Sequence, residues 1–405
     1  MSAPPRGCPA HEVDLDPYDP ALTEPAVWDV YTDVRERGAV AHSAARGGFY
    51  LLSRFADVRA ALLDPGTFSS ASGHRIPVDG SQQVLPIDFD PPLHTAYRKL
   101  MRPALEPRRI RALRPVLQAR VEGLVEDYVR AGGGDFVAAV ALPLPLQVLI
   151  EVVGFAPESV ARFREITEDL WSGLTTTTFP EAVAAIAALM QVEVTRHRTH
   201  RPDDYVTGLL DAQVEGRPVR DDEIVGTLMS LAVAGHETTM NSASALASLL
   251  AADPDLQDEV RAAPDRAAEY VEEMLRLRSP AQNFARRTTR DTEVGGTALP
   301  AGSGVLLSFA AANRDPRQFP DPDRFDVERG GRGHLAFGWG IHLCIGAALA
   351  RTELALLLEA LAAHPPFRLD GEVAFGPLQG GNHLGPTRLP LRFDGVTPTY
   401  QEPAP

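Results

Sequence analysis

The chain has 405 residues, of which 44% are hydrophobic and 23% charged, a composition ordinary for a globular protein with a sizeable core. Its formal net charge of −15 argues against nucleic acid as the main partner, because phosphates would be repelled. No run of about 18 uncharged apolar residues occurs, the first residues do not resemble a secretory signal, and two cysteines, Cys8 and Cys344, exclude a disulfide scaffold. We therefore expect a cytoplasmic protein without a membrane anchor.

The sequence shows no repeat, no low-complexity linker and no abrupt change of composition. The two ends are Pro-rich and polar. We expect residues 1–20 to be a loosely ordered N-terminal segment, residues 21–395 a single domain, and residues 396–405 a tail.

Predicted elements, taken in chain order, are mostly helical. Apolar residues at 110–128 fall on one helical stripe, and a long helix should begin at the acids near 221 and continue to about 252. A further helix is predicted over 265–278. Residues 293–309 alternate and contain two glycines, which indicates short strands and a turn, and an Ala/Leu-rich helix follows over 345–364. The sequence predicts a mainly α protein with a minor β part.

The segment from Phe337 to Gly346 contains the second cysteine in an unusual context. A lone cysteine is most often only a small hydrophobic residue. Here Gly338 and Gly340 allow a tight turn whose amides can point at one sulfur, and Cys344 lies where a helix begins. Free N–H groups and the helix dipole should lower the thiol pKa and favour a metal-binding thiolate. No second ligand lies at zinc-like spacing, so a single axial haem ligand is the better interpretation.

This loop resembles the haem-binding loop of the cytochrome P-450 family. The shared positions are Phe337, Gly338, Gly340, His342, Cys344 and Gly346. The resemblance extends from about Leu51 to Phe393 and implies a single large triangular helical domain with a minor β-sheet region. It also implies haem b (iron protoporphyrin IX) on Cys344, with Ala234, Phe337 and Gly338 in contact with it. Trp339 departs from the family, which often has His, Arg or Ser there.

A second motif, Ala234-Gly235-His236-Glu237-Thr238-Thr239, interrupts the apolar run of the long predicted helix. Alone it fits a solvated turn of a surface helix as well as a functional site. A threonine hydroxyl and a carboxylate can relay protons, and Gly235 leaves room for cofactor and oxygen. The segment resembles the family's acid–alcohol pair, which makes Glu237 and Thr238 the expected catalytic residues. His236 is expected to point away from the iron.

Haem has two propionates, which need cationic or hydrogen-bonding partners once buried. His94 and Arg98 lie four apart on one helical face and can reach one acidic group together. They match the family's propionate-binding pair, and Arg286, chosen over Arg287, and His342 match two further positions. The alternative for each is a surface salt bridge.

By the same resemblance, Glu273, Arg276 and Arg324 form the family's Glu–Arg–Arg cluster. Glu273 and Arg276 lie three apart on a predicted helix, which is a weak indication by itself. We expect the trio to hold the segment that precedes the cysteine loop.

A basic run between residues 98 and 120 has eight cations and one acid, Glu106. The cations are Arg98, Lys99, Arg102, Arg108, Arg109, Arg111, Arg114 and Arg120. A solvated helix face explains this run as well as steering of an acidic redox protein does. No flavin or nicotinamide fingerprint follows a predicted strand, so electrons must come from outside. Bacterial-type members of the family usually use a ferredoxin and ferredoxin reductase, which we expect here.

The family frame also predicts the walls of a substrate pocket, near residues 70–90, 165–180, 227–238, 280–285 and 380–386. Most side chains there are apolar or neutral: Leu85, Ile87, Trp171, Leu174, Leu231, Ala234 and Phe284, with hydrogen-bonding capacity from Gln282, Asn283 and the threonines at 175–178. A medium-sized, mostly apolar small molecule is therefore expected.

We expect a haem-dependent monooxygenase that activates O2 with external electrons and hydroxylates, O-dealkylates or epoxidises such a molecule in specialised metabolism or catabolism. The alternatives are a peroxygenase or oxidative-coupling enzyme on the same haem, or a non-catalytic haem sensor or carrier. The Glu237–Thr238 pair argues against them, since they do not need a proton relay on the oxygen side.

Overall fold

The computed structural model describes residues 10–80, 83–172, 179–329 and 333–396, and helices dominate it. The helices are α1 (Ala26–Arg37), α2 (Phe55–Leu63), α3 (Leu93–Leu105), α4 (Pro107–Arg130), α5 (Pro143–Val153), α6 (Pro157–Ser172), α7 (Phe179–His200), α8 (Tyr205–Leu210), α9 (Asp221–Ala252), α10 (Pro254–Ala262), α11 (Ala267–Leu277), α12 (Phe309–Asn313) and α13 (Ala347–Ala362). In the part of the chain so described, no helix combines the length and the apolar character that crossing a membrane requires.

The strands are short and gather mainly in one mixed sheet. They are β1 (His11–Glu12), β2 (Val40–Ser43), β3 (Phe49–Leu52), β4 (Phe68–Ser69), β5 (Gly133–Asp135), β6 (Gln213–Val214), β7 (Arg217–Pro218), β8 (Asn283–Thr288), β9 (Thr292–Val294), β10 (Thr297–Leu299), β11 (Gly304–Ser308), β12 (Phe367–Leu369), β13 (Ala374–Phe375), β14 (Pro386–Arg388) and β15 (Pro390–Phe393). The main sheet has the order β1-β2-β3-β11-β8-β4. The fold is mainly α with a minor β region, as predicted.

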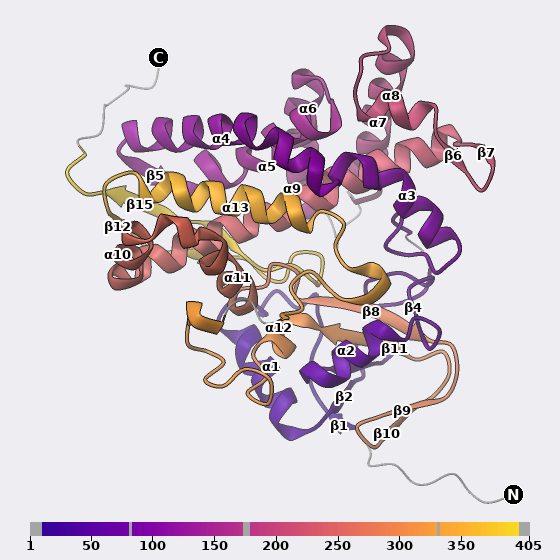
Figure 1. The fold of residues 1–405 in the computed structure, drawn as a ribbon. Helices are drawn as coiled ribbons and strands as arrows, with labels where there is room; N and C mark the ends of the chain where they lie inside the picture. The colour runs from indigo at the N-terminus through magenta and orange to yellow at the C-terminus, as the bar shows by residue number, and fades with distance from the viewer. Residues whose placement is uncertain (1–9, 81–82, 173–178, 330–332, 397–405) are drawn as a thin grey trace, which may run out of the picture.

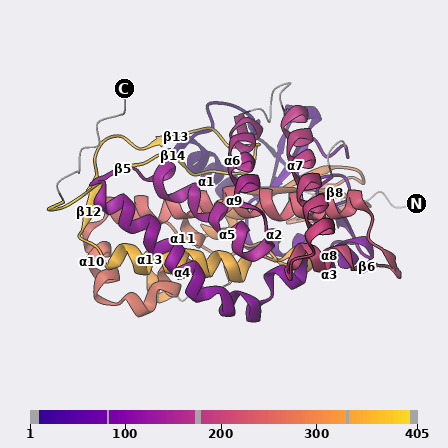
Figure 2. The same cartoon turned by 90° about the horizontal axis from the view of Figure 1, so that it is seen from above.

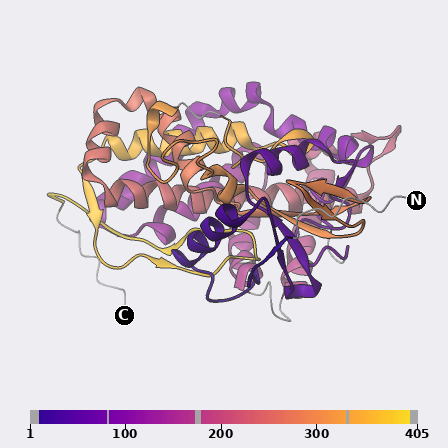
Figure 3. The same ribbon diagram turned by 90° about the horizontal axis from the view of Figure 1, so that it is seen from below.

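Helices and sheet occupy different parts of the molecule. In Figure 1 the helices α4, α9 and α13 cross the upper part, and the main sheet lies below them with α1 and α2. Figure 2, from above, shows α6 and α7 standing across this helical layer. Figure 3, from below, shows the N-terminal strands (indigo) beside the strands of residues 283–308 (orange). The two groups of strands are connected by the parallel pairing of β3 with β11.

The long helix α9 runs through the helical part and has the bounds predicted for it, 221–252. Its first turn is fixed by Glu223, whose carboxylate accepts hydrogen bonds from the backbone N–H of Arg220 at 2.9 Å and the hydroxyl of Tyr97 at 3.0 Å. The Arg217 guanidinium beside it lowers the pKa of Glu223 to about 2. The helix packs against α3, α5, α7, α11 and α13, so its middle is held on several sides.

Other predicted elements are confirmed with small changes of bounds. The stripe at 110–128 lies in α4, the helix after the cysteine is α13, and the helix predicted over 265–278 is a 3-10 turn followed by α11. Residues 293–309 give the β9–β10 hairpin and β11. Gly295 and Gly296 turn that hairpin with φ of 54° and 82°, which glycine adopts readily.

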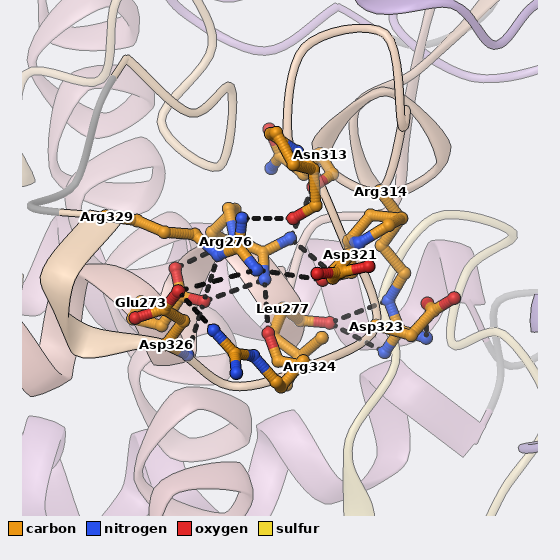
Figure 4. A network of polar contacts seen from close by, with 12 residues as sticks. Glu273, Arg276, Leu277, Asn313, Arg314, Asp321, Asp323, Arg324, Asp326 and Arg329 are labelled. Carbon is orange, nitrogen blue, oxygen red and sulfur yellow. Dashed lines mark hydrogen bonds and ion pairs between the residues drawn. The ribbon is translucent and has the colours of Figure 1, made fainter.

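The Glu–Arg–Arg cluster has a different third member from the one predicted. Glu273 is fully buried and accepts two 2.8 Å hydrogen bonds from Arg276 and one of 3.2 Å from Arg329 (Figure 4). Arg324 instead pairs with Asp326 at 2.9 Å, with its side chain 68% exposed. The prediction of Arg324 is therefore wrong. Its backbone carbonyl, and not its guanidinium, joins the network, because it accepts from Arg276 at 3.2 Å.

Candidate active site

Cys344 lies in a tight loop between a 3-10 turn at Gly340–His342 and the first residue of α13. Its N–H donates to Phe337 O at 2.9 Å, which closes the loop. Gly338 and Gly340 both have φ of 68°, and a Cβ on Gly340 would lie 2.5 Å from Leu62 O. Glycine is therefore required at position 340 by the close approach as well as by the backbone angle.

The thiol of Cys344 is exposed to a cavity but enclosed by protein beyond it. Desolvation raises its pKa, although the N–H groups of Gly346 and Ala347 and the charge of Arg98 act in the opposite direction. The predicted lowering of this thiol pKa is therefore wrong: the donors are present, but burial outweighs them. A thiolate here needs a further positive charge, which a metal ion supplies.

A large cavity lies between α9 and the Cys344 loop. It has about 1560 Å³ of space not filled by protein atoms, its open mouth included. Its wall includes Ala234, Gly235 and Thr238 from α9, and Phe337, Gly338 and Cys344 from the loop.

Basic side chains converge at one side of this cavity. Arg98 of α3, Arg286 of β8 and His342 line it, and the ring of His94 lies 4.3 Å from that of His342. Desolvation lowers the pKa of Arg286 to about 10, and desolvation with the charge of Arg286 lowers the pKa of His342 to about 2. The structure thus brings together all four residues predicted to bind propionates.

Their hydrogen-bonding capacity is largely unused. Both ring nitrogens of buried His94 lack a hydrogen-bond partner among the described residues. The Arg286 guanidinium donates a hydrogen bond of 2.7 Å to Ala285 O. His342 Nε2 lies 3.0 Å from the hydroxyl of Ser70. Buried donors without acceptors are costly, so this cluster suits an anionic ligand.

On the α9 side, the backbone opens the cavity at Ala234 and Gly235. Both residues are exposed to it, and a Cβ on Gly235 would meet nothing within 4 Å. The Thr238 hydroxyl donates to Ala234 O at 2.8 Å. Its oxygen lone pairs therefore remain available to accept from a molecule in the cavity.

His236 and Glu237 are buried and lie outside the cavity wall. The ring of His236 packs against Phe163 of α6 with centroids 5.8 Å apart, which agrees with the expectation that it points away. Desolvation raises the pKa of Glu237 well above its ordinary value. Thr238 and Glu237 are consecutive on a helix, so they face about 100° apart, and only the threonine reaches the cavity.

The substrate side of the cavity differs in part from the prediction. Ile87, Leu231 and Phe284 line it as expected. Gln282 and Asn283 do not line the cavity, so the prediction that they offer hydrogen bonds to a substrate is wrong. Gln282 donates to Ser279 O, and Asn283 donates to the hydroxyl of Tyr31 at 2.7 Å. Asn283 begins β8 and faces away from the side of Phe284, because alternate residues of a strand face opposite sides, while Gln282 precedes the strand and is turned toward Ser279.

Two other parts of the predicted wall are not in it. The described wall includes nothing from residues 380–386, because that loop packs on the other side of α9. Leu85 packs against Gly226 of α9. The side chains of Trp171 and Leu174 and the threonines at 175–178 lie outside the described residues.

Sequence reasoning missed Glu353, a buried acid of α13 that lines the cavity. Burial raises its pKa to about 8. A glutamate on the same Ala/Leu-rich helix that begins after Cys344 was the signal that could have found it, since acids are seldom fully buried without a reason. No cluster of three potential metal-ligating side chains occurs in the described chain, so Cys344 stands alone in that respect.

Part of the basic run at 98–120 is neutralised. Arg114 pairs with Glu359 at 2.9 Å, Arg120 with Glu151 at 2.8 Å and Arg102 with Glu106 at 3.4 Å, while Arg109 donates to Val152 O. Lys99, Arg108 and Arg111 are exposed, and the structure gives them no ion pair within its described ranges. The positive surface is smaller than the sequence indicates.

Comparison with known proteins identifies the family. Residues 169–370 match the family model described as cytochrome P-450. The chain is 36% identical over 366 residues to the beta-dihydromenaquinone-9 omega-hydroxylase of Mycobacterium tuberculosis, covering 87% of this chain and 73% of that protein. It is 36% identical over 358 residues to nocardicin C N-oxygenase of Nocardia uniformis, covering 85% and 89%. A solved cytochrome P-450 of Chondromyces apiculatus is 31% identical, with a TM-score of 0.83 over 96% of this chain and 99% of that one.

Fold and relatives together define an oxidoreductase that works with haem iron. The chain belongs to the cytochrome P-450 family and is a cytochrome P-450 monooxygenase. Members of this class act on small molecules and receive electrons from redox partners.

Proposed function

We propose that this protein uses haem b, with Cys344 as axial ligand, to insert one oxygen atom of O2 into a medium-sized, mostly apolar molecule. The observation that carries the proposal is a lone thiol on one wall of a cavity whose other wall is the Ala234–Thr238 segment of α9. A thiolate-ligated haem, when bound, supplies O–O bond cleavage. Phe337, Gly338 and Ala234 would contact the macrocycle from its two faces.

The residues present suit this cofactor. His94, Arg98, Arg286 and His342 offer donors at one side of the cavity, and both ring nitrogens of His94 are buried without a partner among the described residues. Two propionates would accept from them. Burial keeps the Cys344 thiol protonated, so iron binding would displace its proton and leave the thiolate among the N–H donors that begin α13. The basic cluster lacks acceptors, and the Cys344 thiol lacks the positive charge that a thiolate needs. A single ligand that carries both carboxylates and a metal ion would supply both.

Proton handling is assigned to α9. Desolvation raises the pKa of Glu237 well above its ordinary value and so favours the protonated form, an acid with a proton to give. Thr238 accepts on its cavity side while it donates to Ala234 O, and rotation of the hydroxyl turns it into a donor toward the cavity. Glu237 then acts as the proton source and Thr238 as the group that orients delivery.

The substrate class follows from the cavity wall. Ile87, Leu231 and Phe284 are apolar, and the charged wall residues Arg98, Arg286 and Glu353 come from other elements than α9. A neutral, mainly apolar molecule fits such a wall. Relatives named as an omega-hydroxylase and an N-oxygenase support oxygen insertion as the reaction, with the substrate set by each chain's own wall.

Electrons are assigned to a ferredoxin and its reductase. The exposed cations Lys99, Arg108 and Arg111 lie on α3 and α4, and Arg98 of α3 lines the cavity. An acidic protein would be attracted to this surface despite the net charge of −15. We further propose that the protein works in the cytoplasm, where such donors are reduced.

The test separates oxygen insertion from a peroxygenase, a coupling enzyme and a haem sensor. Thr238→Ala should retain haem and substrate binding but release hydrogen peroxide in place of product, because proton delivery is no longer oriented. General acid–base groups contribute about 10²–10⁴ in rate. The control is Thr227→Ala, which removes a similar hydroxyl-to-carbonyl bond of 2.7 Å on the same helix, outside the cavity wall. Electrons consumed, peroxide and product are measured together, and full coupling in Thr238→Ala would refute the relay.

A further inference from the structure

Glu237 faces a loop near the C-terminal end of the chain. The loop joins β13 and β14, and its His383 brings Nδ1 to 3.3 Å from Oε2 of Glu237. Both side chains are buried, with Glu237 1% exposed and His383 7% exposed. Burial of two titratable groups costs free energy, and such costs are typical of functional sites. Packing of the apolar cavity on the other face of α9 does not explain this pair.

The loop is fixed on α9 and on the segment before β8. His383 N donates to Gln379 O at 3.0 Å, Gln282 N to Asn382 O at 2.7 Å, and Leu384 N to Pro280 O at 3.0 Å. From α9 itself, Asn241 Nδ2 donates to the side-chain oxygen of Gln379 at 3.1 Å. The backbone on both sides of His383 is therefore held, and the position of its ring opposite Glu237 follows from these bonds.

The same loop reaches partly exposed side chains on its outer side. Arg75 Nε donates to Gly380 O at 3.2 Å, and the ring of Tyr18 would lie 3.1 Å from a Cβ on Gly381. Arg75 and Tyr18 are both only half-buried. His383 thus lies between a buried acid and a stretch of chain that approaches solvent.

Burial favours the uncharged forms of Glu237 and His383. Desolvation raises the pKa of Glu237, and Arg75 offsets it only in part. Desolvation, with the charges of Arg75 and His74, lowers the pKa of His383 to about 3. His74 has its own carboxylate partner, Asp88, at 2.8 Å. Both shifts favour the uncharged forms, a protonated acid beside a neutral imidazole, between which a proton could pass without a buried net charge.

We propose that His383 is a positioning residue of the proton route, which holds Glu237 and returns a proton to it in each turnover. When Glu237 has given up its proton, Nδ1–H of His383 transfers its proton to Oε2, and Nε2 takes one from water on the outer side. The water that gave this proton is reprotonated from solvent. The imidazole ends with one proton, now on Nε2, and exchange with water restores the Nδ1–H tautomer before the next turnover; no electrons move. The inference rests on the proposed use of Glu237 as proton source.

The test compares His383→Asn, His383→Ala, Glu237→Gln and a control. Asparagine keeps a donor near Nδ1 but cannot exchange protons through the ring. The control is His197→Asn, which removes another fully buried histidine, 2.9 Å from Asp204, on α7. Holoenzyme is assayed for haem content, product formation and its solvent deuterium effect, and infrared spectra record the protonated carboxyl band that Glu237→Gln removes.

His383→Asn and His383→Ala should slow turnover about 10²-fold, at the low end for acid–base groups because water can partly replace the ring. The solvent deuterium effect should rise and the carboxyl band should shift, while His197→Asn changes none of these. If turnover is slow in Glu237→Gln but normal in the His383 variants, this inference is overturned and the proposed function stays intact. Normal turnover in Glu237→Gln would overturn both. If the His383 variants lose haem, the wild-type spectrum still decides, since an ionised Glu237 at pH 7 contradicts the proposal.

Discussion

Replacing Arg329 with alanine should destabilise the protein much more than replacing Arg324, the residue that the family pattern selects. The reason is the fully buried carboxylate of Glu273, to which Arg329 Nε donates at 3.2 Å from a side chain 10% exposed. Arg329 also donates to Asp321 O at 2.8 Å. Arg324 has an exposed guanidinium paired with Asp326.

The magnitudes follow from these partners. A hydrogen bond to a charged group contributes about 1.5–3 kcal/mol, and breaking a buried ion pair costs about 3–5 kcal/mol. Glu273 keeps Arg276 and the N–H of Asp326 at 2.9 Å, so Arg329→Ala should cost about 2–4 kcal/mol. Arg324→Ala removes an exposed pair worth about 0–1 kcal/mol. Its carbonyl bond to Arg276 remains.

Urea unfolding of both variants at equal haem saturation, followed by far-UV circular dichroism, measures the difference. A lower midpoint for Arg329→Ala, with Arg324→Ala close to wild type, is expected. Equal midpoints, or a larger loss in Arg324→Ala, would refute the structural assignment and restore the family-based one.

Three further predictions concern the cavity and its surroundings. Arg98→Ala should weaken haem binding about 10–100-fold, as the loss of one charged hydrogen bond requires, measured by haem transfer to apomyoglobin; unchanged transfer would contradict a propionate contact. Arg111→Glu should slow reduction by ferredoxin, and more at low ionic strength because screening is weaker there; a loss that ignores salt would argue against steering. Burial raises the pKa of Glu353 from its ordinary 4.5 to about 8, so its neutral form favours folding fully below 4.5 and this contribution is lost as pH rises to 8. Haem-free Glu353→Gln should therefore gain stability relative to wild type between pH 5 and 8, and parallel unfolding midpoints would count against the shift.

Much of the scaffold could be predicted from local patterns. The acids at the start of α9, the apolar stripe of α4 and the helix after Cys344 depend on neighbours in sequence, and the structure confirms them. His94 and Arg98 lie four apart on α3, so local spacing predicted that pair. The convergence of the pair with Arg286 of β8 and with His342 followed from family resemblance, since these residues come from separate elements.

What could not be predicted depends on contacts between distant segments. Whether Arg324 or Arg329 reaches Glu273 is decided by the path of an irregular segment. The side of β8 on which Asn283 lies is set by pairing with β11, and the orientation of Gln282 by its bond to Ser279 before that strand. The contact of His383 with Glu237 is set by the return of the C-terminal loop onto α9. The thiol pKa of Cys344 depended on a balance between burial and nearby donors, and sequence indicates only the donors.

The central claim is that Cys344 binds the haem iron through its sulfur. The direct measurement is the absorption spectrum of the reduced, CO-treated protein, for wild type and Cys344→Ala at matched haem content. The wild type should have the long-wavelength Soret band of a thiolate-ligated iron, and Cys344→Ala should lack it. Retention of that band in Cys344→Ala, or its absence from the wild type, would contradict the assignment.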